Sequence, residues 1–243
     1  MTLFENKNTL DKRSKMVYNY CVGVCLHISA HRITILGIYH IMEMTGKLER
    51  VLSSDRWFHA TTKANYENIR KQGIIADFNR GKELDFGYGF YLTTSERLAE
   101  GYLSRLYGRL DSTNESLVIM EYSFQPIVWF VSGDYSVATF ESFDDEFAEF
   151  VFMNRLECKT NEQRHNFDVI YGVMSDSVPT QLLLEYRAGE ISKEVVLAGL
   201  KKGNSMKQLS IHSQELCNSI TLSRAYEYDP KTEERKELDI HDE

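Results

Sequence analysis

The chain has 243 residues, of which 42% are hydrophobic and 12% aromatic, with three prolines. This composition provides a sizeable core and excludes a disordered chain, and the length fits one domain of ordinary size plus a small addition. The formal net charge of −8 gives no general attraction to phosphate backbones and therefore argues against tight non-specific binding of nucleic acid. A local basic groove, with Lys201, Lys202 and Lys207 as candidates, is compatible with this charge.

Residues 1–54 are expected to form a small helical module. The segments 15–30 and 33–44 are apolar enough to pack on each other or on a partner, and Gly46 is a helix stop signal. The apolar run at residues 16–28 is too short to cross a bilayer before histidines and an arginine interrupt it. A buried helix and a protein without membrane contact are therefore expected.

The chain has four cysteines without the spacing of a disulfide framework: Cys21, Cys25, Cys158 and Cys217. Reduced thiols in a cytoplasmic protein are therefore favoured over disulfides. Cys21 and Cys25, with His27 and His31, superficially resemble a metal site. On one helix, however, the cysteine pair and the histidine pair point roughly 120° or more apart, so no metal site is expected.

From Arg56 onward, short strands alternate with helices over residues 55–230. The expected strands lie at 57–62, around Tyr91, and at 117–124, 167–173, 208–212 and 220–228, with 127–131 as a further candidate. The expected helices lie at 65–72, from Ser95 through Tyr102, and at 144–155, 180–188, 192–200 and 214–219. Residues 231–243 are dominated by charge and are expected to form a flexible tail.

The most informative stretch is DFGYGFYLTT at residues 85–94, and the helix that follows places Tyr102 eleven residues after Tyr91. Ahead of it, the strand WFHATT at residues 57–62 carries His59 and precedes a helix that Gly73 ends. This order of strand with His, helix, glycine-rich turn, strand with Tyr and helix with a second Tyr resembles the NAD-binding half of the ADP-ribosyltransferase superfamily. The resemblance is to the branch of diphtheria-type toxins and poly-ADP-ribose polymerases. Within it, the chain is most similar to an uncharacterised bacterial family often encoded beside small antitoxin-like genes.

The resemblance implies an α+β fold, an ADP-ribosyltransferase-like split β-sandwich with flanking helices, and NAD as co-substrate. Breaking the nicotinamide–ribose bond passes through an oxocarbenium-like transition state. His59, with Thr61 beside it, is expected to donate a hydrogen bond to a hydroxyl of the adenosine-side ribose. Tyr91 and Tyr102 are expected to stack on the nicotinamide, with a cation–π contribution of about 0.5 to 2 kcal/mol. Gly89 is expected to allow close approach of the ligand.

The third catalytic role, which is hydrogen bonding or negative charge near the nicotinamide-side ribose, departs from the family pattern. Toxin-like enzymes have a Glu where this chain has Gln208, which can bind a ribose hydroxyl but carries no charge. That departure argues against polymer synthesis and leaves transfer of a single ADP-ribose possible. Glu149 and Asp176 are candidates for a replacement acid. On the same helix as Glu149, Asn154 and Arg155 are candidates for NAD binding, with Arg155 suited to the pyrophosphate.

Each of these residues also has a purely structural interpretation. His59 could be an ordinary core or surface histidine, and the glycines and tyrosines could belong to a hairpin and the core. Glu149, Arg155 and Asp176 could form surface ion pairs or helix caps.

The leading hypothesis is a mono-ADP-ribosyltransferase, a bacterial toxin or phage-defence effector that modifies a protein, RNA or DNA, with the acidic charge favouring protein. The alternatives are an NAD glycohydrolase and a catalytically inactive module that binds NAD or ADP-ribose. An antitoxin or regulator could bind the N-terminal helices.

Overall fold

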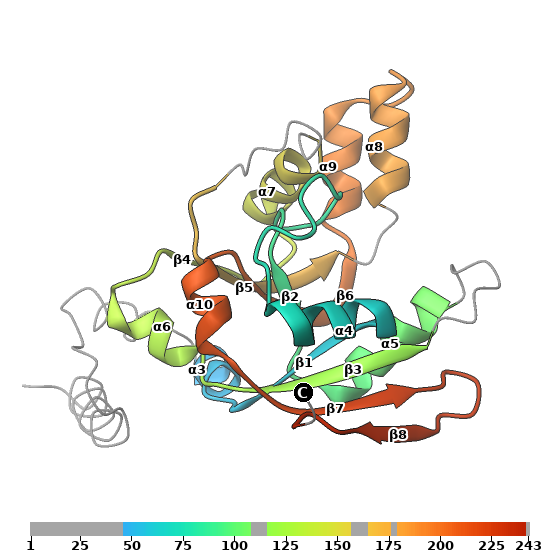
Figure 1. Ribbon diagram of the computed structural model, residues 1–243. Helices are drawn as coiled ribbons and strands as arrows, with labels where there is room; N and C mark the ends of the chain where they lie inside the picture. The colour runs from blue at the N-terminus through green and yellow to red at the C-terminus, as the bar shows by residue number, and fades with distance from the viewer. Residues whose placement is uncertain (1–45, 108–115, 157–164, 176–178, 242–243) are drawn as a thin grey trace, which may run out of the picture. The chain divides into compact units, whose positions relative to one another are not determined.

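The computed structural model of the chain describes residues 46–107, 116–156, 165–175 and 179–241 (Figure 1). The chain divides into a larger unit, Ser54–Phe124 with Ser136–Glu243, and a smaller one, Met1–Ser53 with Gln125–Tyr135. The boundary expected after residue 54 falls beside the observed one, but the smaller unit also includes an internal segment. The two helices expected at 15–30 and 33–44 lie outside the described residues.

In the smaller unit, α3 (Gly46–Leu52) and α6 (Ile127–Ser132) are described. Residues 127–131, a candidate strand from the sequence, are helical, which corrects that prediction. A short apolar run has no periodicity that separates a buried strand from a buried helix. The flanking residues favour the helix, because Pro126 precedes its first turn and Gly133, at φ 75°, ends it in the left-handed conformation.

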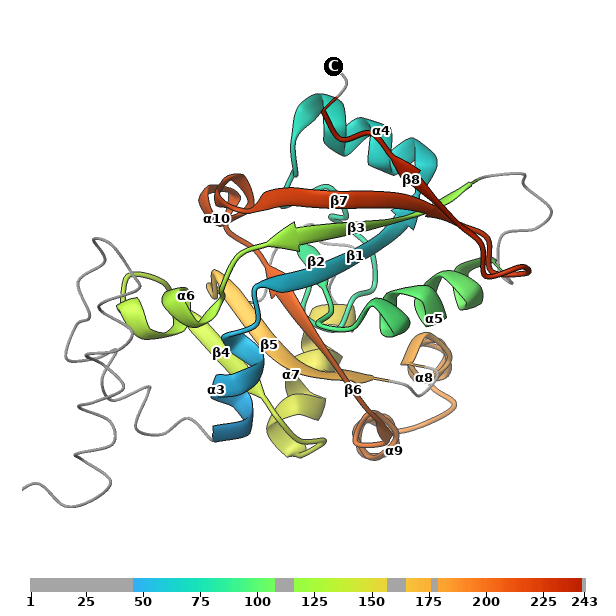
Figure 2. The ribbon, with the colours of Figure 1, turned by 90° about the horizontal axis from the view of Figure 1, so that it is seen from below.

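The first sheet of the larger unit has four strands in the order β1-β3-β7-β8, all antiparallel (Figure 2). Their bounds are β1 (Arg56–Thr62), β3 (Leu117–Ser123), β7 (Thr221–Tyr228) and β8 (Arg235–Leu238). The β8 strand corrects the prediction of a flexible tail, because it pairs with β7 from Ala225↔Leu238 to Tyr228↔Arg235. Its charge reflects a solvent-facing edge strand, where charged side chains are common.

The second sheet has the order β2-β6-β5-β4. Its strands are β2 (Phe90–Leu92), β6 (Gly203–Ile211), β5 (Val169–Ser175) and β4 (Val137–Phe140). The β4 strand is parallel to β5, and the other pairs are antiparallel. The sequence did not predict β4, because it is short and only Phe140 among its residues is buried.

The helices of the larger unit are α4 (Lys63–Gln72), α5 (Glu96–Tyr107), α7 (Asp145–Leu156), α8 (Pro179–Arg187), α9 (Lys193–Leu200) and α10 (Gln214–Ser219). The α5 helix packs on the first sheet through Ala99 and Leu103, which share a core with Phe58 and Ile119. The α7, α8 and α9 helices lie together on one side of the second sheet (Figure 1). In the ranges that the structure describes, no helix combines the length and apolar character needed to cross a bilayer.

The two sheets meet where their edge strands, β1 and β2, form one isolated antiparallel bridge. At this bridge Phe58 and Thr93 exchange backbone hydrogen bonds of 2.8 and 2.9 Å. The expected α+β class is therefore confirmed, as two four-stranded sheets with helices. The bridge also brings two of the sequence motifs, 57–62 and 85–94, into contact.

Candidate functional site

His59 lies where β1 and β2 separate. In a continuous antiparallel ladder, the hydrogen-bonded pair after Phe58 and Thr93 would be Ala60 with Tyr91. Instead, Nδ1 of His59 lies 2.8 Å from the backbone oxygen of Tyr91, and the imidazole stacks on Phe90 with ring centroids 4.3 Å apart. The side chain therefore takes the hydrogen bond that the next backbone pair would have made.

The hydrogen bond to Tyr91 fixes the tautomer of His59. A carbonyl oxygen can only accept, so Nδ1 carries the proton and donates. Burial lowers the pKa of His59 to about 4, so the ring is neutral near neutral pH and its Nε2 is an acceptor. The expectation that His59 donates to a ligand hydroxyl is therefore wrong in direction: the hydroxyl would donate to Nε2.

Tyr91 directs its side chain to the glycine-rich turn. Its hydroxyl donates to the backbone oxygen of Gly87 at 2.7 Å and accepts from the N–H of Phe86 at 3.1 Å. Its ring stacks on Phe86, with centroids 6.5 Å apart. The phenol of Tyr91 thus closes the turn, whereas Tyr102, 45% exposed on α5, is the better placed of the two tyrosines for stacking on a ligand.

Gly89 is required by packing within the chain. A Cβ at this position would come within 2.7 Å of Nδ1 of His212 and 3.0 Å of the backbone oxygen of Ile211. The Asn79 side chain also bonds both the N–H and the carbonyl of Gly89, each at 2.9 Å. These contacts with the chain itself explain the glycine better than the expected approach of a ligand.

Two histidines that the sequence did not assign to the site hold the same turn. His212 Nδ1 lies 2.6 Å from the oxygen of Tyr88, and His165 Nε2 lies 2.8 Å from the oxygen of Phe86. Their rings meet edge to face, with centroids 4.6 Å apart. Both nitrogens that face carbonyl oxygens donate. His165 is neutral because Phe167 N donates to its other nitrogen at 3.2 Å. Burial lowers the pKa of His212 to about 3, so its Nε2, 2.8 Å from the Ser210 hydroxyl, accepts.

Asp85 is the centre of a buried polar network and is a residue to which the sequence assigned no role. It is 5% exposed. Its Oδ1 accepts from Nε of Arg155 at 2.8 Å, and its Oδ2 accepts from the Ser175 N–H at 3.0 Å and from Nε2 of Gln208 at 3.3 Å. The aspartate lies inside the quoted motif, but its partners are far away in sequence, so no local pattern shows the network.

The other candidate residues on α7 have internal partners. Arg155 is committed to Asp85 and also donates to the backbone oxygen of Glu83 at 2.9 Å. Asn154 is buried and donates to the oxygen of Phe150 one turn earlier. In this conformation neither side chain is presented to a pyrophosphate, so these two cofactor-binding predictions have no support in the contacts.

Glu149 forms an ion pair with Lys193 at 2.8 Å, and the two side chains are 43% and 40% exposed. This is the surface ion pair that was the structural alternative to a catalytic acid.

Thr61, expected beside His59, is 6% exposed. Asp176 lies outside the described residues.

Strand pairing brings Gln208 to the same junction as His59 and Tyr91. Tyr91 pairs with Ser210 and Leu92 pairs with Leu209. The next position along β6, Gln208, therefore lies beside Thr93, the residue that bridges to β1. Three segments far apart in sequence thus occupy the adjacent strands β1, β2 and β6, and their junction is the candidate site.

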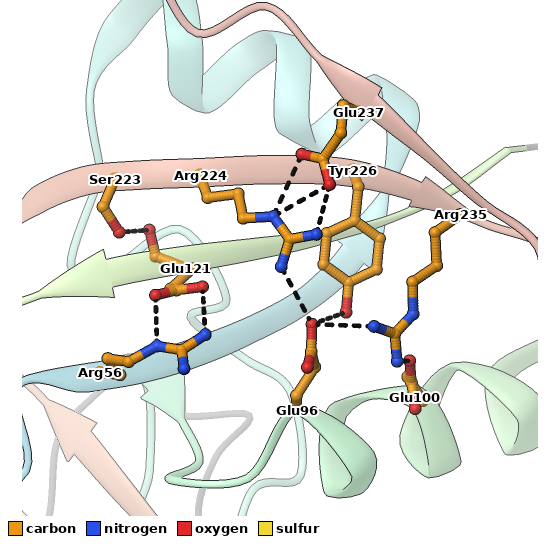
Figure 3. Close-up of polar contacts among 9 residues, drawn as sticks. All are labelled: Arg56, Glu96, Glu100, Glu121, Ser223, Arg224, Tyr226, Arg235 and Glu237. Atoms are coloured by element: carbon orange, nitrogen blue, oxygen red, sulfur yellow. Dashed lines mark hydrogen bonds and ion pairs between the residues drawn. The ribbon is translucent and has the colours of Figure 1, made fainter.

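A second polar cluster fixes α5 to the first sheet (Figure 3). Glu96, in the first turn of α5, accepts from the Tyr226 hydroxyl at 2.8 Å and from Arg224 and Arg235 at 3.3 and 3.4 Å. Arg235 also pairs with Glu100, one turn further along the helix. These contacts hold α5, the helix that carries Tyr102, against β7 and β8.

A family model described as a protein of unknown function, DUF3990, matches residues 59–222. The match covers well over half of the chain. The chain belongs to the DUF3990 family. The DUF3990 match begins at His59 and includes the glycine-rich turn, Tyr91, Arg155 and Gln208, so it contains the three candidate residues of the junction. Neither a curated protein nor a solved structure matches the chain.

Acid is expected to destabilise the fold through the buried histidines. Desolvation by burial lowers the pKa of His59 to about 4 and, with a contribution from His165, that of His212 to about 3. An unfolded histidine has a pKa of about 6.5, so below that pH the unfolded chain binds more protons. Stability should hold above about pH 7 and fall as the pH drops, by about 2 kcal/mol per histidine at about pH 5.

Thermal unfolding midpoints between about pH 8 and about pH 5 measure this loss. The control is His212→Asn, whose amide can still donate to the Tyr88 oxygen but cannot titrate. It should lower stability at neutral pH and flatten the pH dependence, leaving the part that His59 and His165 contribute. An unchanged slope in this variant would rule out His212 as a source of the acid sensitivity.

Proposed function

We propose that this DUF3990 chain is a mono-ADP-ribosyltransferase that uses NAD as co-substrate. The observation that carries the proposal is the placement of His59, Tyr91 and Gln208 on the adjacent strands β1, β2 and β6. The sequence resemblance assigns these three positions to the NAD site of the superfamily. Two four-stranded sheets whose edge strands β1 and β2 are joined by a β-bridge are compatible with the split β-sandwich that the resemblance implies.

The hydrogen-bonding character of the junction suits a ribose. His59 offers Nε2 as an acceptor, because its Nδ1–H donates a hydrogen bond to the backbone oxygen of Tyr91. Gln208 donates to Asp85 through Nε2, which leaves its carbonyl oxygen as a second acceptor. A hydroxyl of the adenosine-side ribose can donate to His59, and a hydroxyl of the nicotinamide-side ribose can donate to Gln208. The oxocarbenium ion develops on the second ribose, so a hydrogen bond that strengthens there lowers the barrier.

The residues divide between binding and catalysis. Tyr102 offers an exposed aromatic face to the nicotinamide cation, which binds and orients the substrate without itself accelerating the reaction. Gln208 holds a ribose hydroxyl but has no charge of its own, which favours transfer of one ADP-ribose over synthesis of a polymer. The acceptor is proposed to be a macromolecule, protein or nucleic acid.

The biological setting proposed for this activity is a cytoplasmic toxin or phage-defence effector of a bacterium. Cys217, the cysteine that the structure describes, is a buried free thiol, in keeping with a reducing compartment. An antitoxin or regulator that binds the N-terminal segment remains part of the same proposal.

Nicotinamide release from labelled NAD tests the activity and separates it from its alternatives. The purified chain is assayed alone and with a bacterial lysate divided into protein and nucleic-acid fractions. Release that increases with one fraction and leaves label on it supports the transferase and identifies its acceptor class. Equal release without any fraction indicates an NAD glycohydrolase. NAD binding without release indicates an inactive binding module, and the absence of both release and binding contradicts the proposal.

A further inference from the structure

Resting on the proposed function, we propose that Asp85 is a positioning residue: it fixes the Gln208 amide so that its oxygen is presented to substrate. The two side chains come from the glycine-rich turn and from β6, 123 residues apart in sequence, and Nε2 of Gln208 lies 3.3 Å from Oδ2 of Asp85. Both residues are buried, with 5% and 7% of their surface exposed.

The orientation of the amide follows from the chemistry of its partner. An ionised carboxylate only accepts hydrogen bonds, so the NH₂ group of Gln208 must face Asp85. The opposite rotamer would place two oxygens against each other. Asp85 is itself held by Arg155 and by the Ser175 N–H, so it cannot turn away to relieve such a clash. Gln208 is therefore an acceptor toward any ligand hydroxyl, as a glutamate would be.

The charges of the network explain why glutamine occupies this position. Arg155 and Asp85 form a close ion pair, with Nη2 and Oδ1 at 2.7 Å and 11% and 5% of the side chains exposed. Together with neutral Gln208, the network has no net charge. A glutamate at position 208 would place a second carboxylate in hydrogen-bonding range of Asp85, and two buried carboxylates at that distance cannot both ionise readily.

Exchanging the two groups tests the pairing. Gln208→Glu gives the network one extra negative charge, and Asp85→Asn leaves Arg155 without its carboxylate. The double variant restores neutrality and reverses the bond, because the new asparagine can donate to the new glutamate. Recovery of activity in the double variant is expected to be partial, because the Ser175 N–H loses its acceptor when Asp85 is replaced.

We expect each single variant to lower kcat/KM for nicotinamide release by about 100-fold, and the double variant to exceed both by at least about tenfold. Gln208→Glu should also gain activity as the pH falls from about 8.5 to about 6.5, because a proton shared by the two carboxylates removes the repulsion. A residue that only stabilises the fold would not create this pH dependence.

The matched control is Gln181→Glu. Gln181 also donates from Nε2 to a carboxylate, that of Glu185 at 2.7 Å, but on the exposed surface of α8. Water screens the added charge there, so activity and pH profile should match those of the wild type. Wild-type activity and pH profile in Gln208→Glu, or a double variant no better than the single variants, would overturn the proposal.

The stability of the wild type, the two single variants at Gln208 and Asp85, and the double variant separates this inference from the proposed function. If the wild type releases no nicotinamide, the proposed function fails, but the pairing is still tested by thermal unfolding. The sum of the two single effects gives the stability expected of the double variant if the residues do not interact. A double variant that is more stable than this by at least about 1 kcal/mol supports the Asp85–Gln208 pair. Additive effects on stability overturn it.

Discussion

His59→Asn is expected to lower NAD turnover by about 100-fold while leaving the fold intact. The Nδ2 group of asparagine can take the place of Nδ1 and donate to the backbone oxygen of Tyr91, which His59 bonds at 2.8 Å. Asparagine has no atom where Nε2 lies, so the acceptor for the ribose hydroxyl is lost. The measurement is the rate of nicotinamide release, with the thermal unfolding midpoint as the check on folding.

His59→Gln is the companion variant, because glutamine reaches the position of Nε2 but not that of Nδ1. It should retain more turnover than His59→Asn and lose more stability. The opposite order would show that His59 acts only through Tyr91, as a structural residue at the point where β1 and β2 separate.

Asp85→Ala is expected to lower the free energy of unfolding by about 3 to 5 kcal/mol. The substitution leaves the Arg155 guanidinium, 11% exposed, without its carboxylate. It also removes the acceptor of the Ser175 N–H and of the Gln208 amide. Breaking one side of a buried ion pair has this large effect because the remaining charge is desolvated and unpaired. Chemical denaturation at neutral pH measures the difference.

Glu149→Ala is the control for that loss. The Glu149–Lys193 pair has a similar distance, 2.8 Å, but its side chains are 43% and 40% exposed. An exposed pair contributes about 0 to 1 kcal/mol. If the two variants lost stability equally, the network around Asp85 would not be the buried anchor of the glycine-rich turn that its contacts indicate.

Local sequence signals predicted most of the larger unit. Gly73 and Gly189, at φ 79° and 77°, follow the ends of α4 and α8 as expected, because glycine takes a positive φ without strain. The alternation of strands and helices from Arg56 onward is also confirmed. The misassigned elements, residues 127–131 and the β8 strand, are those where burial and sheet pairing override composition.

The candidate site was only partly predictable. His59 and Tyr91 are recognisable because each lies in a short motif, and Gln208 because its strand matches the place of the family's glutamate strand. The structure places these three segments on adjacent strands. The contacts of Asp85 with Arg155 and of His165 with Phe86 join residues 70 and 79 positions apart. Such pairs arise from tertiary packing, so a single sequence contains no local pattern that predicts them.

Gln208 and Glu149 are the alternatives for the third catalytic role, and of the two Gln208 lies at the junction of β1, β2 and β6 that we propose as the NAD site. The most direct measurement is nicotinamide release from labelled NAD by the wild type, Gln208→Ala and Glu149→Ala in parallel. We expect release by the wild type, equal release by Glu149→Ala, and a loss of about 100-fold in Gln208→Ala. A larger loss in Glu149→Ala than in Gln208→Ala would contradict it.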